Sequence, residues 1–254
     1  HATLAFGVIF LAACSQGANP AAQFQAHDIA DFNGYAVAVA DFNNDGRLDV
    51  MANSLGMSEV SWYENPTWER HVIVEGVSSV VNQAIADING DGIPEVAYQS
   101  QFAMQAENSE GLNWIAMSQG DPTMPWTTQQ IDAFPTSHHV AWADLDGDGD
   151  LDIVVCIFGD TEGSVVWLEN SGNGSWPSHQ LDHRSGAIHA FPFDADGDGD
   201  LDIAVSLSQL SEEVLIFRND GLGNFQKHVL ASSDDDSFGM SGISISDLDQ
   251  DGDF

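Results

Sequence analysis

The chain has 254 residues, of which 40 are Asp or Glu and only 5 are Lys or Arg, so its formal net charge is −35. This balance excludes a nucleic-acid partner and adsorption to an anionic bilayer, because both require clustered basic side chains. The hydrophobic fraction of 43% excludes a disordered acidic tail and predicts one large folded domain or two small ones.

The first residues have the pattern of an export signal. The chain does not start with Met, and a short apolar run ends in Leu11-Ala-Ala-Cys14. Such a run is typical of a signal-peptide core and is too short to span a bilayer. Its ending resembles the lipobox of bacterial lipoproteins, in which the Cys carries the lipid, although an ordinary secretory signal also fits. We predict a truncated signal peptide at residues 1–13, a lipid on Cys14 and a tether over residues 14–23.

The lipobox resemblance implies a location as well. It implies export in a Gram-negative bacterium, to the outer membrane, the cell surface or the periplasm. Contact with the membrane would then be made only through the lipid anchor.

Five acidic segments recur over residues 24–254. Four of them are nonapeptides with the pattern Asp-x-Asp/Asn-x-Asp-Gly-x-x-Asp/Glu, and the fifth stops before its ninth position. A repeat unit of about 50 residues predicts one supersecondary unit per repeat, stacked or arranged around an axis. The segments begin at Asp41, Asp87, Asp144, Asp194 and Asp247.

Four short β-like runs accompany each acidic segment. One precedes the segment and two follow it. The fourth carries an aromatic residue followed by His or Gln and then Ile or Leu. Four short strands in about 50 residues are typical of a propeller blade. The expected strands, blade by blade, are 36–40, 50–52, 60–63 and 68–73; 81–85, 96–98, 112–115 and 126–131; 139–142, 153–158, 165–168 and 176–181; 188–191, 203–207, 214–217 and 225–230.

A further copy of the fourth-strand pattern, at residues 24–29, precedes the first acidic segment. We expect it to complete a blade whose other strands lie beyond Phe254, since such closure removes a free edge. The chain would then hold four full blades and parts of two others.

These segments and strands, in register, resemble the FG-GAP/VCBS repeat family, whose members are similar to the integrin α-subunit propeller. The resemblance covers residues 24–254. It implies an all-β fold, a β-propeller of four-stranded blades, of which the whole protein would have seven.

The acidic segments have the ligand spacing of calcium loops. Ca²⁺ takes about six to eight hard oxygen ligands. Carboxylates or amides at positions one, three, five and nine and a carbonyl at position seven supply them, while Gly at position six permits the sharp turn. The predicted ligands are Asp41, Asn43, Asp45, Arg47 and Asp49; Asp87, Asn89, Asp91, Ile93 and Glu95; Asp144, Asp146, Asp148, Asp150 and Asp152; Asp194, Asp196, Asp198, Asp200 and Asp202; and Asp247, Asp249, Asp251 and Asp253.

The five loops are not equally strong candidates for calcium. The first two carry fewer carboxylates and are expected to bind more weakly, and metal-free acidic turns remain the alternative. An EF-hand is excluded, because position twelve is never Glu and the flanks are strand-like. Mg²⁺ is disfavoured by its small octahedral shell. The expected role of Ca²⁺ is structural.

The histidines fall into two groups. His27, His71, His179 and His228 share the repeated fourth-strand position and are expected to be structural. His138, His139 and His189 break the repeat, and in a propeller they would meet near the channel mouth, opposite the acidic loops. They are candidates for holding Zn²⁺ or another metal, or for acid–base catalysis, with polar channel lining as the alternative.

Two functions follow from these patterns. The leading hypothesis is a binding or adhesion scaffold, stabilised by calcium, with a protein or a polysaccharide as partner. The alternative is a sugar-processing lyase or dehydratase with its site at the channel mouth, since the aldos-2-ulose dehydratases are similar propellers with a metal in that region.

Overall fold

The computed structural model describes residues 26–31, 33–159, 163–209, 212–233 and 241–247. The chain divides into two units, His1–Asp31 and Phe32–Phe254. In the first unit, residues 26–31 form no strand, so the outer strand predicted at 24–29 is absent from the described part of that segment. Cys14 and the rest of the predicted signal and tether lie outside the described residues.

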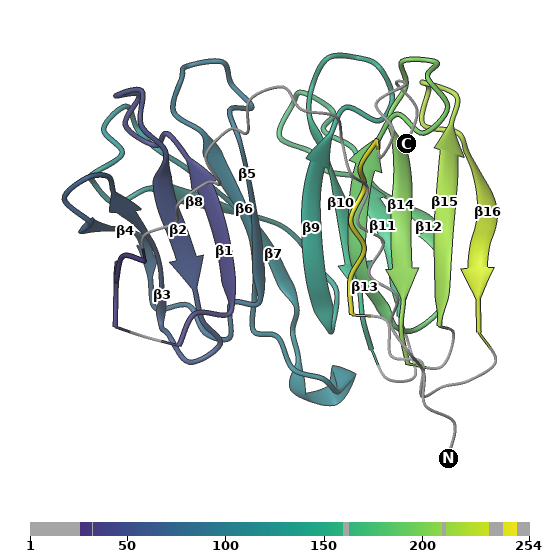
Figure 1. The fold of residues 1–254 in the computed structure, drawn as a ribbon, viewed down its shortest axis with the longest axis horizontal. Coiled ribbons are helices and arrows are strands. Elements are labelled where there is room, and N and C mark those ends of the chain that lie inside the picture. Colours follow the sequence, from purple (N-terminus) through teal and green to yellow (C-terminus); the bar gives the residue numbers. More distant parts are fainter. Residues whose placement is uncertain (1–25, 32, 160–162, 210–211, 234–240, 248–254) are drawn as a thin grey trace, which may run out of the picture. The chain divides into compact units, whose positions relative to one another are not determined.

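The described part of the second unit consists of four antiparallel sheets of four strands each (Figure 1). In every sheet each strand pairs with the next one along the chain, which confirms the predicted four-stranded repeat. The strands are β1 (Ala36–Ala40), β2 (Asp49–Asn53), β3 (Glu59–Glu64) and β4 (Glu69–Glu75); β5 (Asn82–Ala86), β6 (Glu95–Ser100), β7 (Leu112–Met117) and β8 (Thr127–Ala133); β9 (Ser137–Ala143), β10 (Asp152–Ile157), β11 (Ser164–Leu168) and β12 (Ser178–Asp182); β13 (Ala187–Phe193), β14 (Asp202–Leu207), β15 (Glu213–Asn219) and β16 (Phe225–Ser232).

Helix is almost absent from the described residues. They contain one short 3₁₀-helix, η1 (Ala106–Asn108), between β6 and β7. No helix in that part of the chain has the length and apolarity needed to cross a bilayer.

The second strands of the sheets are deeply buried. Every residue of β6, β10 and β14 is buried, because successive side chains of a strand point to opposite faces and both faces are covered. In β10, Val154 packs toward the fourth sheet and Val155 toward the second. The continuous apolar run at residues 153–158 therefore reflects a strand between two cores.

Three apolar cores separate the four sheets. The first contains Trp62 and Tyr98, from the first and second sheets. Ile115 and Ile153 belong to the second core, and Trp167 and Phe217 to the third. Each core thus joins two sheets that are consecutive in sequence.

The first strands of consecutive sheets lie beside one another. β1 contacts β5, β5 contacts β9, and β9 contacts β13. Buried polar side chains bridge these strands and their neighbours: Asn53 donates to Gln83, Gln99 donates to Ser137, and Val140 N donates to Asn82 Oδ1 at 3.3 Å. Four-stranded blades in chain order, joined through their first strands, form a β-propeller fold. The expectation of seven blades in the whole protein stays a prediction.

Candidate functional site

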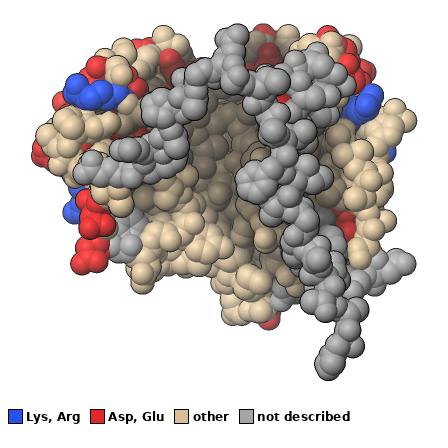
Figure 2. Space-filling view, in the orientation of Figure 1, with Lys and Arg blue, Asp and Glu red and all other residues tan. Residues whose placement is uncertain are grey.

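The acidic loops lie at one end of the blades, and each joins the first strand of its sheet to the second. Figure 2 shows Asp and Glu side chains gathered along the edge at the top of that view, where these loops lie. We number them loop one (41–49), loop two (87–95), loop three (144–152) and loop four (194–202). The fifth loop begins at Asp247, and its other predicted ligands, Asp249, Asp251 and Asp253, lie outside the described residues.

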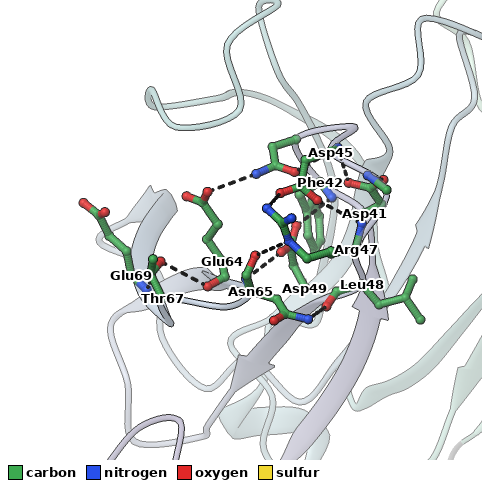
Figure 3. A network of polar contacts seen from close by, with 12 residues as sticks. Asp41, Phe42, Asp45, Arg47, Leu48, Asp49, Glu64, Asn65, Thr67 and Glu69 are labelled. Carbon is green, nitrogen blue, oxygen red and sulfur yellow. Dashed lines mark hydrogen bonds and ion pairs between the residues drawn. The ribbon is translucent and has the colours of Figure 1, made fainter.

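The carboxylate at position nine of each loop is buried. In loop three, Asp152 Oδ2 accepts a hydrogen bond from Leu145 N at 3.0 Å, and Oδ1 accepts one from Asn170 N at 2.8 Å. The same pair of bonds recurs in loop four and in loop one, where Figure 3 shows it. Position nine therefore fastens the loop to the end of the third strand, a role that the ligand spacing did not predict. The four residues, each no more than 1% exposed, are Asp49, Glu95, Asp152 and Asp202.

Loops three and four each bring three carboxylates together. One oxygen of each of Asp144, Asp146 and Asp152 lies within 4.8 Å of the other two. These side chains occupy positions one, three and nine. Oxygens this close can share one hard cation, so the residues present fit Ca²⁺. The corresponding group in loop four consists of Asp194, Asp196 and Asp202.

Hydrogen bonds within each loop fix this arrangement. In loop three, Asp144 accepts from Gly147 N at 2.9 Å and from Gly149 N at 3.2 Å, while Asp148 accepts from Asp150 N at 2.9 Å. Both glycines have positive φ, 74° and 94°, which larger residues rarely adopt. The position-one carboxylate thus organises the backbone of the turn.

Loops one and two differ at position three, where the side chain is an amide. Asn89 Nδ2 donates to Glu95 Oε1 at 2.6 Å, and Asn43 Nδ2 donates to Glu64 Oε1 at 3.2 Å. In loop two the amide therefore satisfies part of the loop's own acidic charge, and in loop one it bonds a carboxylate at the end of β3. Weaker calcium binding by loops one and two stays a prediction, with this contact as its physical reason.

Crowding and burial shift the carboxyl pKa values upward. The pKa of Asp152 is raised to about 6, chiefly by burial and also by the charges of Asp146 and Asp148, against backbone hydrogen bonds that lower it. Burial also raises the pKa of Asp49 and of Glu95, against hydrogen bonds from the backbone that lower it. A bound divalent cation would relieve this repulsion, because it supplies the missing opposite charge.

All five basic side chains form ion pairs, and two of these pairs lie in the loops. Arg218 Nη1 contacts Asp196 Oδ2, at position three of loop four, at 2.7 Å. Arg47 pairs with Asp45 in loop one. In loop three the position that corresponds to Arg218 is Glu169. Loops three and four therefore have the same ligands but opposite charges beside position three.

The three histidines that break the repeat lie close together, as predicted. The ring centroids of His139 and His189 are 5.0 Å apart, and those of His138 and His189 are 6.1 Å apart. His139 Nδ1 accepts from Ala190 N at 3.4 Å, and His138 Nδ1 lies 3.1 Å from Ile188 O. Among the described residues, however, these rings do not form a group of three ligand atoms within 4.8 Å.

The environment keeps these imidazoles neutral. The pKa of His139 is lowered to about 3, chiefly by burial and also by the neighbouring His189 and His138. Burial also lowers the pKa of His138 and of His189. A neutral imidazole can bind a metal, but a pKa this low makes His139 a weak base.

The repeated histidines pack on tryptophan. His71 stacks on Trp62 with a centroid distance of 4.4 Å, and its Nε2 lies 2.9 Å from Glu64 Oε2. His179 repeats the arrangement in the third blade, on Trp167 and beside Glu169. This recurrence supports a structural role for His71 and His179, whereas His27 and His228 are exposed and their predicted role stays a prediction. With Glu69, the residues Glu64 and His71 also form a third group of possible metal ligands, which the sequence did not indicate.

The described part of the chain is thus an all-β protein of four-stranded propeller blades with acidic loops. The family model described as FG-GAP-like repeat matches residues 41–98, 87–155 and 154–205, more than half of the chain. The chain belongs to the FG-GAP repeat family.

Similarity beyond the family says little about function. No curated protein matches the sequence. Among 81 matching chains of solved structures is the crystal structure of the exotype rhamnogalacturonan lyase YesX. It shares 11% identity with a TM-score of 0.41, over 76% of this chain and 48% of the lyase. This chain therefore spans about half the length of the lyase, and a likeness of this degree carries no information on activity.

Proposed function

We propose that the protein is an exported, calcium-binding β-propeller that serves as a binding scaffold for a protein or a polysaccharide. The observation that carries the proposal is the convergence of three carboxylates in loop three and again in loop four. Ca²⁺ bound there would cross-link the first two strands of a blade and the end of the third. The family and the fold support the scaffold, and the apolar segment ending at Cys14 supports export with a lipid anchor.

Calcium binding can be measured by equilibrium dialysis against radioactive calcium. Asp146→Asn combined with Asp196→Asn removes the position-three carboxylate from both strong loops. We expect two equivalents fewer of bound calcium at low free concentration. Asp132→Asn, which changes a partly exposed carboxylate on β8 away from the loops, is the matched control and should bind as much as the parent. Equal binding by all three proteins would contradict the proposal.

The anchor is tested separately. Mass spectrometry of the protein from a Gram-negative host should find a lipid-modified Cys14 at the new N-terminus. Cys14→Ser should move the protein from the membrane fraction to the soluble fraction. An unmodified Cys14 in a membrane-associated protein would contradict the lipid anchor, and it would leave the proposed calcium sites unaffected.

The alternative function, a sugar-processing enzyme, has one observation in its favour. His139 and His189 lie 5.0 Å apart, buried and neutral. Zn²⁺ retention by the parent and by His139→Gln combined with His189→Gln, measured by elemental analysis, tests the metal form of this hypothesis. Unchanged metal content would remove the histidines as ligands.

A further inference from the structure

A cavity of about 410 Å³ opens at the end of the blades opposite the acidic loops. Its volume lies within the roughly 300–1,000 Å³ of small-molecule pockets. All four described blades contribute to it, which places it at the channel mouth. Tyr35 comes from the first blade, Phe102 from the second, Phe158 from the third and Ser208 from the fourth.

One wall of the cavity is a run of aromatic rings. His138 lies between two of them, with centroid distances of 5.5 Å to Phe102 and 5.8 Å to Phe158. Tyr35, 54% exposed, extends this apolar lining from the first blade. Phe158 is only 4% exposed and Phe102 is partly exposed, so Tyr35 and Phe102 supply the accessible aromatic surface while Phe158 supports His138 from behind. Accessible aromatic surface in a cavity is a typical platform for the apolar face of a ligand.

His138 adds a hydrogen-bond acceptor to this wall. Its Nδ1 lies 3.1 Å from the carbonyl oxygen of Ile188, so Nδ1 carries the proton and donates it. Because burial keeps the ring neutral, Nε2 has a lone pair, and no described residue donates to it. A ligand hydroxyl in the cavity would find its acceptor there.

Another part of the lining is polar and includes two residues with positive φ. Ser208, Gln209 and Glu212 line it, and the last two have positive φ, 69° and 35°. Strained residues of this kind cluster at ligand sites, where the surrounding structure holds them in place. Here Ser208 N donates to Gly186 O at 2.8 Å, which fixes the backbone of that rim.

The charges around the cavity disfavour an anionic ligand. No Lys or Arg is among the lining residues, and each of the five basic side chains pairs with an acidic one, Arg184 with Asp182 and with Glu213 beside the cavity. The lining itself includes an acidic residue, Glu212, 2% exposed. A uronate or phosphate would enter without a counter-charge from the lining, in a protein of net charge −35. In Figure 2 the acidic side chains gather at the other end of the blades.

We propose that this cavity binds an uncharged sugar ring, with its apolar face against Tyr35 and Phe102 and with a hydroxyl that donates a hydrogen bond to His138 Nε2. A sugar ring has an apolar face and hydroxyls around its edge. It matches a cavity lined by aromatic rings and by the polar side chains of Ser208 and Gln209. A quaternary ammonium group would use the aromatic rings but not the acceptor. This inference rests on the proposed binding function and names neutral saccharides as the ligand class.

Saturation-transfer NMR and calorimetry on the full chain in calcium test the inference. The probes are methyl glycosides of neutral hexoses, the corresponding uronates and choline. A neutral glycoside should bind, and Tyr35→Ala should weaken it about 2- to 10-fold, the range expected for one aromatic contact. Leu222→Ala, which removes a side chain that is 72% exposed and lies outside the cavity lining, is the matched control and should bind as the parent does.

Three outcomes would overturn the inference: no neutral glycoside binds, a uronate or choline binds more tightly, or Tyr35→Ala and Leu222→Ala weaken binding equally. These outcomes are distinct from a failure of the calcium proposal. If calcium binds and no neutral sugar does, the scaffold proposal survives and the ligand class is wrong.

Discussion

Arg218 sets loop four apart from loop three, and its removal should strengthen calcium binding there. Arg218 Nη1 lies 2.7 Å from Oδ2 of Asp196, a predicted ligand, so this ion pair must break before that oxygen can coordinate a cation. Arg218 and Asp196 are 46% and 31% exposed, so their ion pair is worth about 0.2–1 kcal/mol. Arg218→Gln should therefore raise the calcium affinity of loop four about 1.5- to 5-fold, since 1.4 kcal/mol corresponds to a factor of ten.

Calorimetric titration with Ca²⁺ measures this effect. The binding step of loop four is the one lost in Asp198→Asn, which removes the position-five carboxylate. Arg70→Gln is the matched control, because it removes an arginine that is 51% exposed and pairs with Glu59 at 2.6 Å away from the loops. Both variants change the net charge equally. Equal affinity changes in the two variants, or none in Arg218→Gln, would refute the competition between arginine and calcium.

Three further predictions concern single side chains. Asp152→Asn should lower the free energy of unfolding, measured in urea, by about 2–3 kcal/mol, because the asparagine amide has one oxygen and cannot replace both carboxylate oxygens that accept from Leu145 N and Asn170 N. A change below about 0.5 kcal/mol, the size of an ordinary surface substitution, would contradict this role of position nine. Asp148→Asn should weaken calcium binding by loop three, whereas Asp150→Asn should not, because only the carbonyl of Asp150 is a predicted ligand; equal losses would show that ligand assignment to be wrong. His139 has a pKa of about 3 in the folded state and about 6.5 in the unfolded state, so between these values the unfolded state binds more protons. The free energy of unfolding should therefore fall by about 2 kcal/mol from pH 8 to pH 5 on account of His139. His139→Gln should reduce the pH dependence of the free energy of unfolding by that amount.

The repeat could be predicted from the sequence because every blade carries the same pattern of strands and acidic loop within about 50 consecutive residues. The continuous apolar run at 153–158 predicted the right strand, since burial on both faces makes every side chain apolar. The β-branched run at 36–40 also predicted a strand, although Val37 and Val39 are exposed. The copy at 24–29 forms no strand within residues 26–29, and because its predicted partner strands lie beyond Phe254, the blade closure stays a prediction.

The site was only partly predictable for a related reason. Ligand spacing along nine residues predicted the carboxylates of loop three, because they are local in sequence. The contact of Asp152 with Asn170 depends on how three strands are arranged, although Asn65, Asn170 and Asn219 occur at the same place in three repeats and were an available signal. The cavity could not be predicted, because four distant segments contribute its walls.

Thermal unfolding with saturating calcium and with a chelator tests the central claim most directly. Each site in hundredfold excess of calcium over its dissociation constant adds about 2.7 kcal/mol. The account predicts a large rise in Tm with calcium, most of it lost when Asp146→Asn and Asp196→Asn are combined. The same Tm in calcium and in chelator would contradict it.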